Sequence, residues 1–358
     1  MKRRVEKTTQ QRSLDSYRSH KRKRRSAKRV SITTAAILTA VVLLLVSGGC
    51  MYIRFGLLGG LTRTDVDPDN LGLTSEALAL YEDYTNIAVF GLDTREKDDE
   101  GRSDAIMIIC IDQVHNKIKL ISVARDSYVT IENKGKSFHD KITHAWAYGK
   151  HELALKTLNQ NFNMDMTDFV SMNFYQFADV IDYIGGVDID VSRSEMDVMN
   201  TYYIPYLNSY GIQCDYITKT GMQHLSGGQA LAYSRNRYTG TDIDRGNRQR
   251  EVMMAMYDAV KDLSLTKYPT LIRKVLGSCA TSLSDSEMMS LAAWAATSQP
   301  TFEQLGIPTS LKCETINGTS YVVYDVEGAS QQIQDFIHET GQYAPNADEK
   351  KDVSESAS

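Results

Sequence analysis

The sequence predicts an α/β domain, a layered α-β-α fold around a central mixed sheet, preceded by one transmembrane helix. Three features lead to this prediction. Residues 30–53 carry no charge over a length that suits a membrane span. Near-continuous apolar runs follow residue 85, as in strands that are covered on both faces. Beyond them, strand-like and helix-like segments alternate, which is typical of a sheet packed between helices.

The N-terminal segment, residues 1–29, is strongly basic. It contains thirteen Lys or Arg against two acidic residues and almost nothing apolar, so we expect a disordered tail that meets anionic lipid. Residues 30–53 are long enough to cross about 30 Å of hydrocarbon as a helix. Positive charge is retained on the cytoplasmic side of the cell membrane. The tail is therefore predicted to be cytoplasmic and everything after Arg54 extracytoplasmic, which makes this a single-pass membrane protein.

Two other interpretations of the apolar segment are weaker. A cleaved signal peptide has a shorter apolar region and an Ala-x-Ala site, which is missing here. Cys50 resembles a lipoprotein cleavage site only in part, because Ser47 stands where a branched aliphatic residue is expected.

Composition limits the classes of partner. With 42% hydrophobic residues, the 358-residue chain can bury a large core. After residue 29, 27 basic residues stand against 43 acidic ones, a formal charge of −16. This balance argues against nucleic acid, and an arginine that binds an anion has to do so in a local pocket. The cysteines have no metal-type spacing. Cys110 lies in an apolar run and is expected to be buried, whereas a disulfide among Cys214, Cys279 and Cys313 stays open.

The part after the membrane helix divides into a linker with a short helix (54–85), a folded extracytoplasmic domain (86–341) and a polar tail (342–358) that we expect to be disordered. Apolar periodicity separates its strands from its helices. The predicted strands are 86–91, 105–112, 117–123, 169–173, 187–191 and 321–326, with a loop at 133–137. The predicted helices are 145–161, 174–184, 226–234, 245–263, 268–276, 285–298 and 327–340. Residues 194–219 fit no usable pattern.

Short polar clusters, rich in arginine and aspartate, interrupt the apolar elements where these end. They are Gly91–Arg95, Gly101–Asp104, Arg125–Asp126, Arg235–Arg237 and Asp242–Gln249. Strand ends on one side of an α/β sheet are where loops converge to bind ligands. Arginine suits phosphate because its planar fork donates two parallel hydrogen bonds and stays charged. Asp93 and Asp104 are the candidate ligands of Mg²⁺, with Mn²⁺ tolerated, and arginine plus metal is the chemistry of phosphoryl transfer.

Each cluster also has a plain structural interpretation. Arg125 and Asp126 could form a surface ion pair, Asp242 and Asp244 could cap a helix, and Arg248 could be solvated. Spacing alone does not prove that the clusters converge.

Other reactive side chains give no clear signal. His139 and His144 are expected to be structural rather than metal ligands or bases. Ser171, Ser234 and Cys279 lack a nucleophile motif, so no covalent nucleophile is predicted.

In order and spacing, the clusters resemble the LytR-CpsA-Psr family of bacterial cell-envelope proteins. The resemblance covers residues 86–261, and the plan of basic tail, membrane helix and outer domain agrees with it. Its motifs are Gly101-Arg102-Ser103-Asp104, Val123-Ala124-Arg125-Asp126, Gly185-Gly186-Val187-Asp188, Leu225-Ser226-Gly227-Gly228-Gln229-Ala230-Leu231-Ala232-Tyr233 and Arg245 to Gln249. Two departures are mild: Ala124 stands where the family usually has Pro, and Lys150 where a second Gly is common.

The resemblance implies an enzyme that transfers a glycopolymer, as glycosyl phosphate, from polyprenyl pyrophosphate to peptidoglycan, usually to the C6 hydroxyl of N-acetylmuramic acid. On this model Asp93 and Asp104 hold Mg²⁺, and the lipid tail enters an apolar slot lined by residues 169–184, with Phe174, Phe177 and Ile181 as candidates. The implied pyrophosphate ligands are Arg102, Arg125, Arg235 and Arg237, completed by Arg245 and Gln249. The implied catalytic residues are Arg102, Asp104, Arg125, Arg245 and Gln249, with the general base left open.

Two alternatives remain at this stage. The first is a receptor or envelope regulator that grips polyprenyl pyrophosphate without turning it over. The second is a lipid pyrophosphatase, because the same arginine and metal clamp would stabilise attack by water. The sequence leaves open whether teichoic acid, capsule or another polysaccharide is moved, and which oligomer forms.

Overall fold

The computed structural model describes residues 62–93, 101–261, 271, 279–310 and 312–340. The chain divides into two compact units, residues 1–59 and residues 60–358, and all described residues belong to the second. Outside the described residues lie the predicted basic tail, membrane helix and C-terminal tail, and nearly all of the predicted helix 268–276. Within the described ranges, no helix combines the length and the hydropathy that a membrane span needs.

The central element of the described chain is a seven-stranded sheet with the strand order β1-β10-β7-β2-β3-β4-β11. Its strands are β1 (Thr62–Arg63), β2 (Tyr84–Leu92), β3 (Ser103–Asp112), β4 (Lys117–Val123), β7 (Asp168–Asn173), β10 (Ala280–Thr281) and β11 (Thr301–Ile307). Strands β2, β3 and β4 form an antiparallel meander, whereas β7 pairs with β2 and β11 pairs with β4 in parallel. The predicted α/β class with a central mixed sheet is confirmed.

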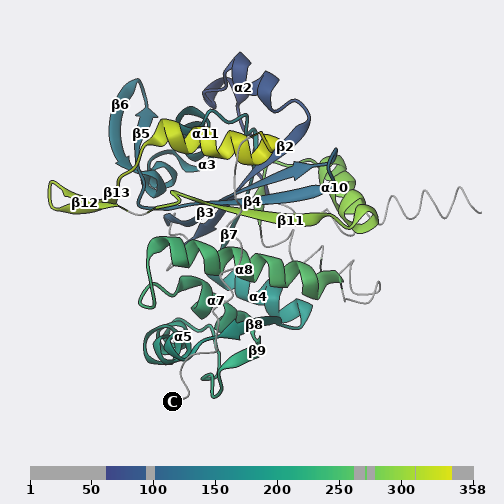
Figure 1. The fold of residues 1–358 in the computed structure, drawn as a ribbon, viewed down its shortest axis with the longest axis vertical. Coiled ribbons are helices and arrows are strands. Elements are labelled where there is room, and N and C mark those ends of the chain that lie inside the picture. Colours follow the sequence, from purple (N-terminus) through teal and green to yellow (C-terminus); the bar gives the residue numbers. More distant parts are fainter. Residues whose placement is uncertain (1–61, 94–100, 262–270, 272–278, 311, 341–358) are drawn as a thin grey trace, which may run out of the picture. The chain divides into compact units, whose positions relative to one another are not determined.

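Helices α3 (Ile142–Phe162) and α11 (Val326–His338) cover one face of the sheet, beside the short α2 (Ser75–Leu80) (Figure 1). Their apolar sides pack on every second residue of the strands, as the alternation of side chains in a strand requires. Phe90, Ile106 and Ile121 from the sheet meet Trp146 and Phe336 in this core. This face is closely filled.

Helices α4 (Phe174–Ile184), α7 (Gly227–Arg235) and α8 (Asp242–Lys261) form the layer on the other face (Figure 1). A capping box starts α4, because Asn173 and Gln176 each accept a backbone N–H from the other residue. A side chain at Gly227 would collide with the carbonyl of Ala178, so glycine lets α7 begin directly against α4. This close approach fixes the direction in which α7 delivers its C-terminal residue, Arg235.

A second core lies beyond these helices, away from the sheet. It contains the antiparallel pair of β8 (Val187–Val191) and β9 (Gly221–Leu225). Between these two strands the chain forms α5 (Arg193–Val198), the π-helix η3 (Met199–Tyr203) and α6 (Ile204–Ser209). The predicted strand 187–191 therefore exists, but it pairs outside the central sheet.

Several predicted boundaries hold: β4, α4, β8 and α10 (Asp285–Ser298) match their predicted ranges. The predicted loop at 133–137 is instead the turn of a hairpin, β5 (Tyr128–Asn133) and β6 (Lys136–Lys141). The strand predicted at 321–326 is wrong in extent, because the chain forms the hairpin β12 (Cys313–Ile316) and β13 (Thr319–Val322) and then enters α11. Strand β6 shows no apolar alternation, because its side chains are mostly exposed.

The folded unit begins before residue 86. Leu71 and Tyr81, from the segment interpreted as linker, are fully buried in the core under α3 and α11. A 3-10 turn, η2 (Pro68–Asn70), leads the chain to this position. Apolar burial of this kind contributes stability to the domain, so the segment is part of it.

Candidate active site

A large apolar cavity lies between the sheet and the layer of α4, α7 and α8. Its volume is about 1200 Å³, at the upper end of what ligand pockets reach. Apolar side chains from the strands and the helices line it, among them Val89, Met107, Ile109, Phe177, Val180 and Met256. These strand residues alternate with those that fill the opposite core, so one face of the sheet is packed and the other faces a cavity.

The cavity becomes polar at one end. All eight residues that the sequence analysis selected line it there, namely Asp93, Arg102, Asp104, Arg125, Arg235, Arg237, Arg245 and Gln249. Arg102 and Arg237 are exposed, which marks this end as the opening to solvent. The structure therefore brings the predicted clusters together.

The ends of β2 and β3 supply the acidic side of the opening. The amides of Asp93 and Asp104 both donate to the carbonyl oxygen of Arg102, at 3.1 and 3.0 Å. This pairing brings the backbones of the two aspartates together where β2 ends and β3 begins. Asp104 accepts from Nη1 of Arg125 at 2.7 Å, and both side chains are largely buried. The expected Arg125–Asp126 pair is looser, at 3.8 Å, and Asp126 pairs with Lys141 at 2.9 Å.

Arg235 comes from the helical layer and reaches the same opening. Its Nη2 lies 3.5 Å from a carboxylate oxygen of Asp93. Its guanidinium stacks over the ring of Phe174, 4.3 Å from the centroid, and lies 5.2 Å from that of Tyr206. Cation–π contacts of this kind hold a guanidinium plane while leaving its edge N–H groups for a ligand. Burial raises the pKa of Tyr206, although the charge of Arg235 opposes this shift.

Helix α8 distributes its polar residues by helical periodicity. Arg245 and Gln249, four residues apart, share the face that lines the cavity. Arg250 turns toward the sheet, where it donates to Ser122 and, at 3.1 Å, to Gln304. Of these three polar side chains, Arg245 and Gln249 can therefore meet a ligand in the cavity, whereas Arg250 is engaged elsewhere.

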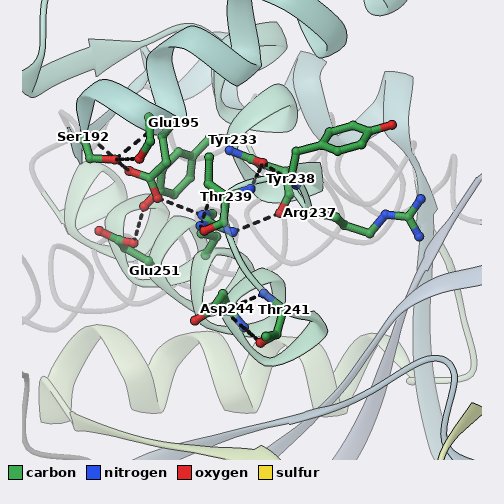
Figure 2. A network of polar contacts seen from close by, with 12 residues as sticks. Ser192, Glu195, Tyr233, Arg237, Tyr238, Thr239, Thr241, Asp244 and Glu251 are labelled. Atoms are coloured by element: carbon green, nitrogen blue, oxygen red, sulfur yellow. Dashed lines mark hydrogen bonds and ion pairs between the residues drawn. The ribbon is translucent and has the colours of Figure 1, made fainter. Parts of the chain in front are cut away.

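Arg248 is buried in a polar network that holds the chain between α7 and α8. Figure 2 shows labelled members of this network, among them Glu195 and Thr239. It donates to Glu195 at 2.8 Å, to the carbonyl of Asn236 at 2.9 Å, and to the carbonyl and hydroxyl of Thr239 at 3.2 and 2.6 Å. The expectation that Arg248 is solvated is wrong. In Figure 2 the side chain of Arg237 extends away from this network.

Neighbouring side chains complete the network. Burial alone would raise the pKa of Glu195, but hydrogen bonds from Ser192 and Arg248 lower it overall. Burial raises the pKa of Glu251, which accepts from the hydroxyl of Tyr233 at 2.7 Å. Thr241 and Asp244 bond each other at the start of α8, which supports the capping interpretation for Asp244 (Figure 2).

The remaining candidates have local partners. His144 bonds Asp140 at 2.9 Å, and His139 lies 3.3 Å from the hydroxyl of Thr130. The described cysteines are free thiols, so the structure pairs none of Cys214, Cys279 and Cys313, and Cys110 is buried as expected.

A second acidic group, outside the cavity, does not fit a metal ion. Asp112, His115 and Glu339 bring ligand atoms within 4.8 Å of one another. However, the buried ammonium of Lys119 lies 3.4 Å from Asp112 and 2.9 Å from Glu339, so the cation of this site is a lysine.

The sequence analysis missed one part of the opening. Tyr202, Tyr203 and Tyr206, from the unassigned residues 194–219, line it together with Tyr238. Their signal is the recurrence of tyrosine in the segment that begins at Tyr202, a pattern without a single periodicity because it crosses a π-helix. Of the residues proposed for the apolar slot, Phe174 and Phe177 line the cavity, whereas Ile181 is buried in the second core.

Comparisons with known proteins agree with the fold. The model of the LytR_cpsA_psr family matches residues 64–337. The chain is 29% identical over 228 residues to the polyisoprenyl-teichoic acid-peptidoglycan teichoic acid transferase TagU of Bacillus cereus, covering 63% of this chain and 68% of that protein. It is 33% identical over 187 residues to the corresponding transferase TagT of Bacillus subtilis, covering 51% and 55%. A solved structure of TagT bound to LIIa-WTA is 25% identical, with a TM-score of 0.58, and covers 73% of this chain and 91% of that one.

Proposed function

The chain belongs to the LytR-CpsA-Psr family, and we propose that it transfers a glycopolymer from a polyprenyl pyrophosphate carrier to peptidoglycan as glycosyl phosphate. One observation carries the proposal: an apolar cavity of about 1200 Å³ ends at five arginines and two aspartates. A lipid pyrophosphate has the same order of parts, with an apolar chain joined to a compact double anion. The names of the related transferases from Bacillus support the same reaction.

Each part of the site has a role in this reaction. The cavity takes the polyprenyl chain, whose burial stabilises the complex. The arginines hold the phosphate oxygens by charge-assisted hydrogen bonds and stabilise the negative charge that spreads over them during transfer. The acceptor hydroxyl forms a new oxygen–phosphorus bond at the sugar-side phosphate, and the bond to the bridging oxygen breaks. Polyprenyl phosphate leaves, and the hydroxyl proton passes to a base that we leave unassigned.

Mg²⁺ is part of the proposal, with Asp93 and Asp104 as its ligands and Mn²⁺ as an alternative. The backbone amides of both aspartates donate to the carbonyl oxygen of Arg102, and both residues line the cavity, which would suit a cation held between protein and phosphate. Each carboxylate also lies beside an arginine, Arg235 or Arg125. When bound, the ion would neutralise pyrophosphate charge. Those arginines would then turn toward the phosphate.

The transferase acts at the cell envelope on this proposal, because its acceptor is a wall polymer. The finer topology follows from the sequence alone: a cytoplasmic N-terminus, one membrane helix at residues 30–53 and an outer catalytic domain. Teichoic acid is the polymer that the related proteins are named for.

The test uses the full-length chain in detergent with a synthetic polyprenyl pyrophosphate oligosaccharide, peptidoglycan fragments and Mg²⁺. Mass spectrometry would look for the phosphodiester-linked product, with Arg125→Ala and Asp104→Ala as variants. Product that requires both residues supports the transferase. Lipid that binds unchanged would instead support a receptor, and sugar phosphate released without attachment would support a pyrophosphatase.

A further inference from the structure

Two tyrosines at the opening of the cavity are exposed although aromatic side chains of this size are usually covered. The side chain of Tyr202 is 54% exposed and that of Tyr238 is 67% exposed. Their ring centroids lie 4.8 Å apart with an angle of 33° between the planes, so they form one tilted surface. Both line the cavity at the end that carries the arginines. Exposed aromatic groups that cluster beside a pocket indicate a binding surface.

The backbone beneath Tyr202 is firmly held. Met199 and Ile204, on either side of it, are fully buried in the second core. The amide side chain of Asn200 forms two hydrogen bonds with the backbone of Ile217, at 2.7 and 2.9 Å. Tyr202 itself lies in the π-helix η3, a conformation that is rare and often found at functional sites. The ring is therefore presented by a rigid support, which lowers the entropic cost of using it for binding.

The tyrosines also connect directly to the arginines of the site. The backbone amide of Arg237 donates to the hydroxyl of Tyr203 at 3.1 Å, and the rings of Tyr203 and Tyr238 lie 6.0 Å apart. Tyr238 follows Arg237 in the chain, whose own side chain is exposed. A group bonded to a phosphate held by Arg235 and Arg237 would consequently extend over the tyrosine pair.

We propose that Tyr202 and Tyr238 form a sugar-binding subsite for the glycan of the lipid-linked donor. The subsite would bind the sugars that follow the pyrophosphate. This inference rests on the proposed function and names a further part of its substrate site. A pyranose ring has apolar C–H faces and polar hydroxyl edges, which match an aromatic face with a phenolic hydroxyl at its rim. The lipid chain does not fit here, because the opening is polar and the apolar cavity lies behind it.

The donor fits the position of the tyrosines better than the acceptor does. The donor's parts are covalently joined, so its first sugar must lie next to the arginines that hold its phosphates. The tyrosine pair lies next to these arginines, because the amide of Arg237 donates to the hydroxyl of Tyr203, whose ring lies beside that of Tyr238. Tyr202, from the segment 194–219 that the sequence left unassigned, thereby acquires a role in recognising the donor sugars.

The experiment compares two lipids with the full-length chain in detergent, octaprenyl pyrophosphate and the same lipid carrying a disaccharide. For Tyr202→Ala and Tyr238→Ala, we expect binding of the glycosylated lipid to weaken about 5- to 20-fold, from the ~1–1.8 kcal/mol typical of aromatic stacking. Binding of octaprenyl pyrophosphate should stay within about twofold of the wild type, because its contacts lie elsewhere. Tyr216→Ala, an equally exposed tyrosine away from the cavity lining, is the matched control and should change neither affinity.

Three results would overturn the inference. Equal losses for both lipids would assign the tyrosines to the structure of the opening, and unchanged affinities would leave them without a role in binding. A raised KM for peptidoglycan fragments with unchanged donor binding would assign the pair to the acceptor. A wild-type chain that binds the disaccharide lipid in a tyrosine-dependent way but forms no product would refute the transferase proposal and leave this subsite in place.

Discussion

Arg248 offers the sharpest test of how the helical layer positions its arginines. The side chain is 7% exposed and forms four hydrogen bonds, one to a carboxylate and three to the chain between α7 and α8. In Arg248→Met, Glu195 would remain buried without its cationic partner. Removing one member of a buried ion pair costs about 3–5 kcal/mol. With an unfolding entropy of about 2.1 cal/mol/K per residue over roughly 280 residues, that lowers Tm by roughly 5–9 °C, which differential scanning calorimetry would resolve.

The same substitution should also affect transfer. Asn236 and Thr239 flank Arg237 and lose their anchor, so the loop that carries this arginine is no longer fixed. We expect kcat/KM for transfer to fall about 10- to 100-fold, as misplacement of a binding group by about 1 Å does. Because Arg248 lines no part of the cavity, this loss would come from positioning and not from a lost ligand contact.

A second variant separates the two effects. Glu195→Gln keeps a hydrogen-bond acceptor for Arg248 and leaves the contacts to Asn236 and Thr239 in place, so stability should fall while kcat/KM changes less than threefold. The reasoning fails if Arg248→Met unfolds within about 1 kcal/mol of the wild type. It also fails if Glu195→Gln reduces transfer as much as Arg248→Met does.

Three further predictions concern the anion site, the cavity and the opposite face. Arg125→Ala should reduce kcat/KM by about 10²–10³, the value of one or two hydrogen bonds to a charged group, in the mass-spectrometric transfer assay; an effect below threefold would remove Arg125 from the site. Val89→Trp should block binding of octaprenyl pyrophosphate with little loss of stability, because the indole ring enters the cavity. Ala88 precedes Val89 and points to the packed face of the sheet, so Ala88→Trp should destabilise the domain by about 3 kcal/mol or more. Hydrogen bonds from Lys117 and Lys119 lower the pKa of Glu339, so Glu339→Gln should lower the free energy of unfolding at pH 7, as measured by denaturant unfolding. The difference from the wild type should shrink as the pH falls below the ordinary glutamate pKa of about 4.3 and close below the lowered pKa of the folded carboxylate; a difference that persists there contradicts this.

The strand and helix pattern of the sheet could be predicted because its residues are buried in a regular order. Strand β4 and helix α4 match their predicted bounds, since one is rich in β-branched and other aliphatic residues and the other begins after a capping residue and ends at Gly185. Strand β11 was missed. It lies at the edge of the sheet, and its first residues are exposed or half-buried, so its apolar signal covers only the last three positions.

The convergence of the candidate site residues on one cavity could be predicted because arginine and aspartate have few reasons to recur at strand ends, and the family resemblance connected the separate clusters. Arg248 shows where this reasoning stops. It belongs to the same motif as Arg245 and Gln249, which line the cavity. Arg248 nevertheless lies on another face of α8, where it donates to Glu195. Burial depends on what packs against the helix, and α5 comes from a segment that carried no readable pattern.

The cavity itself is a physical argument for a ligand. A sealed void costs about 24 cal/mol per Å³, so 1200 Å³ would cost on the order of 30 kcal/mol, more than the ~5–15 kcal/mol that stabilises a typical domain. The fold can keep this volume only if the cavity opens to solvent or is filled by an apolar molecule. The sheet shows that it could have been packed, because Ile106 and Ile108 on the other face are covered by helices while Met107 between them faces the cavity. The cavity is therefore an apolar space that is kept open despite the free-energy cost of leaving it unfilled, and its mouth carries arginines. This combination favours a lipid with an anionic head over any small polar substrate.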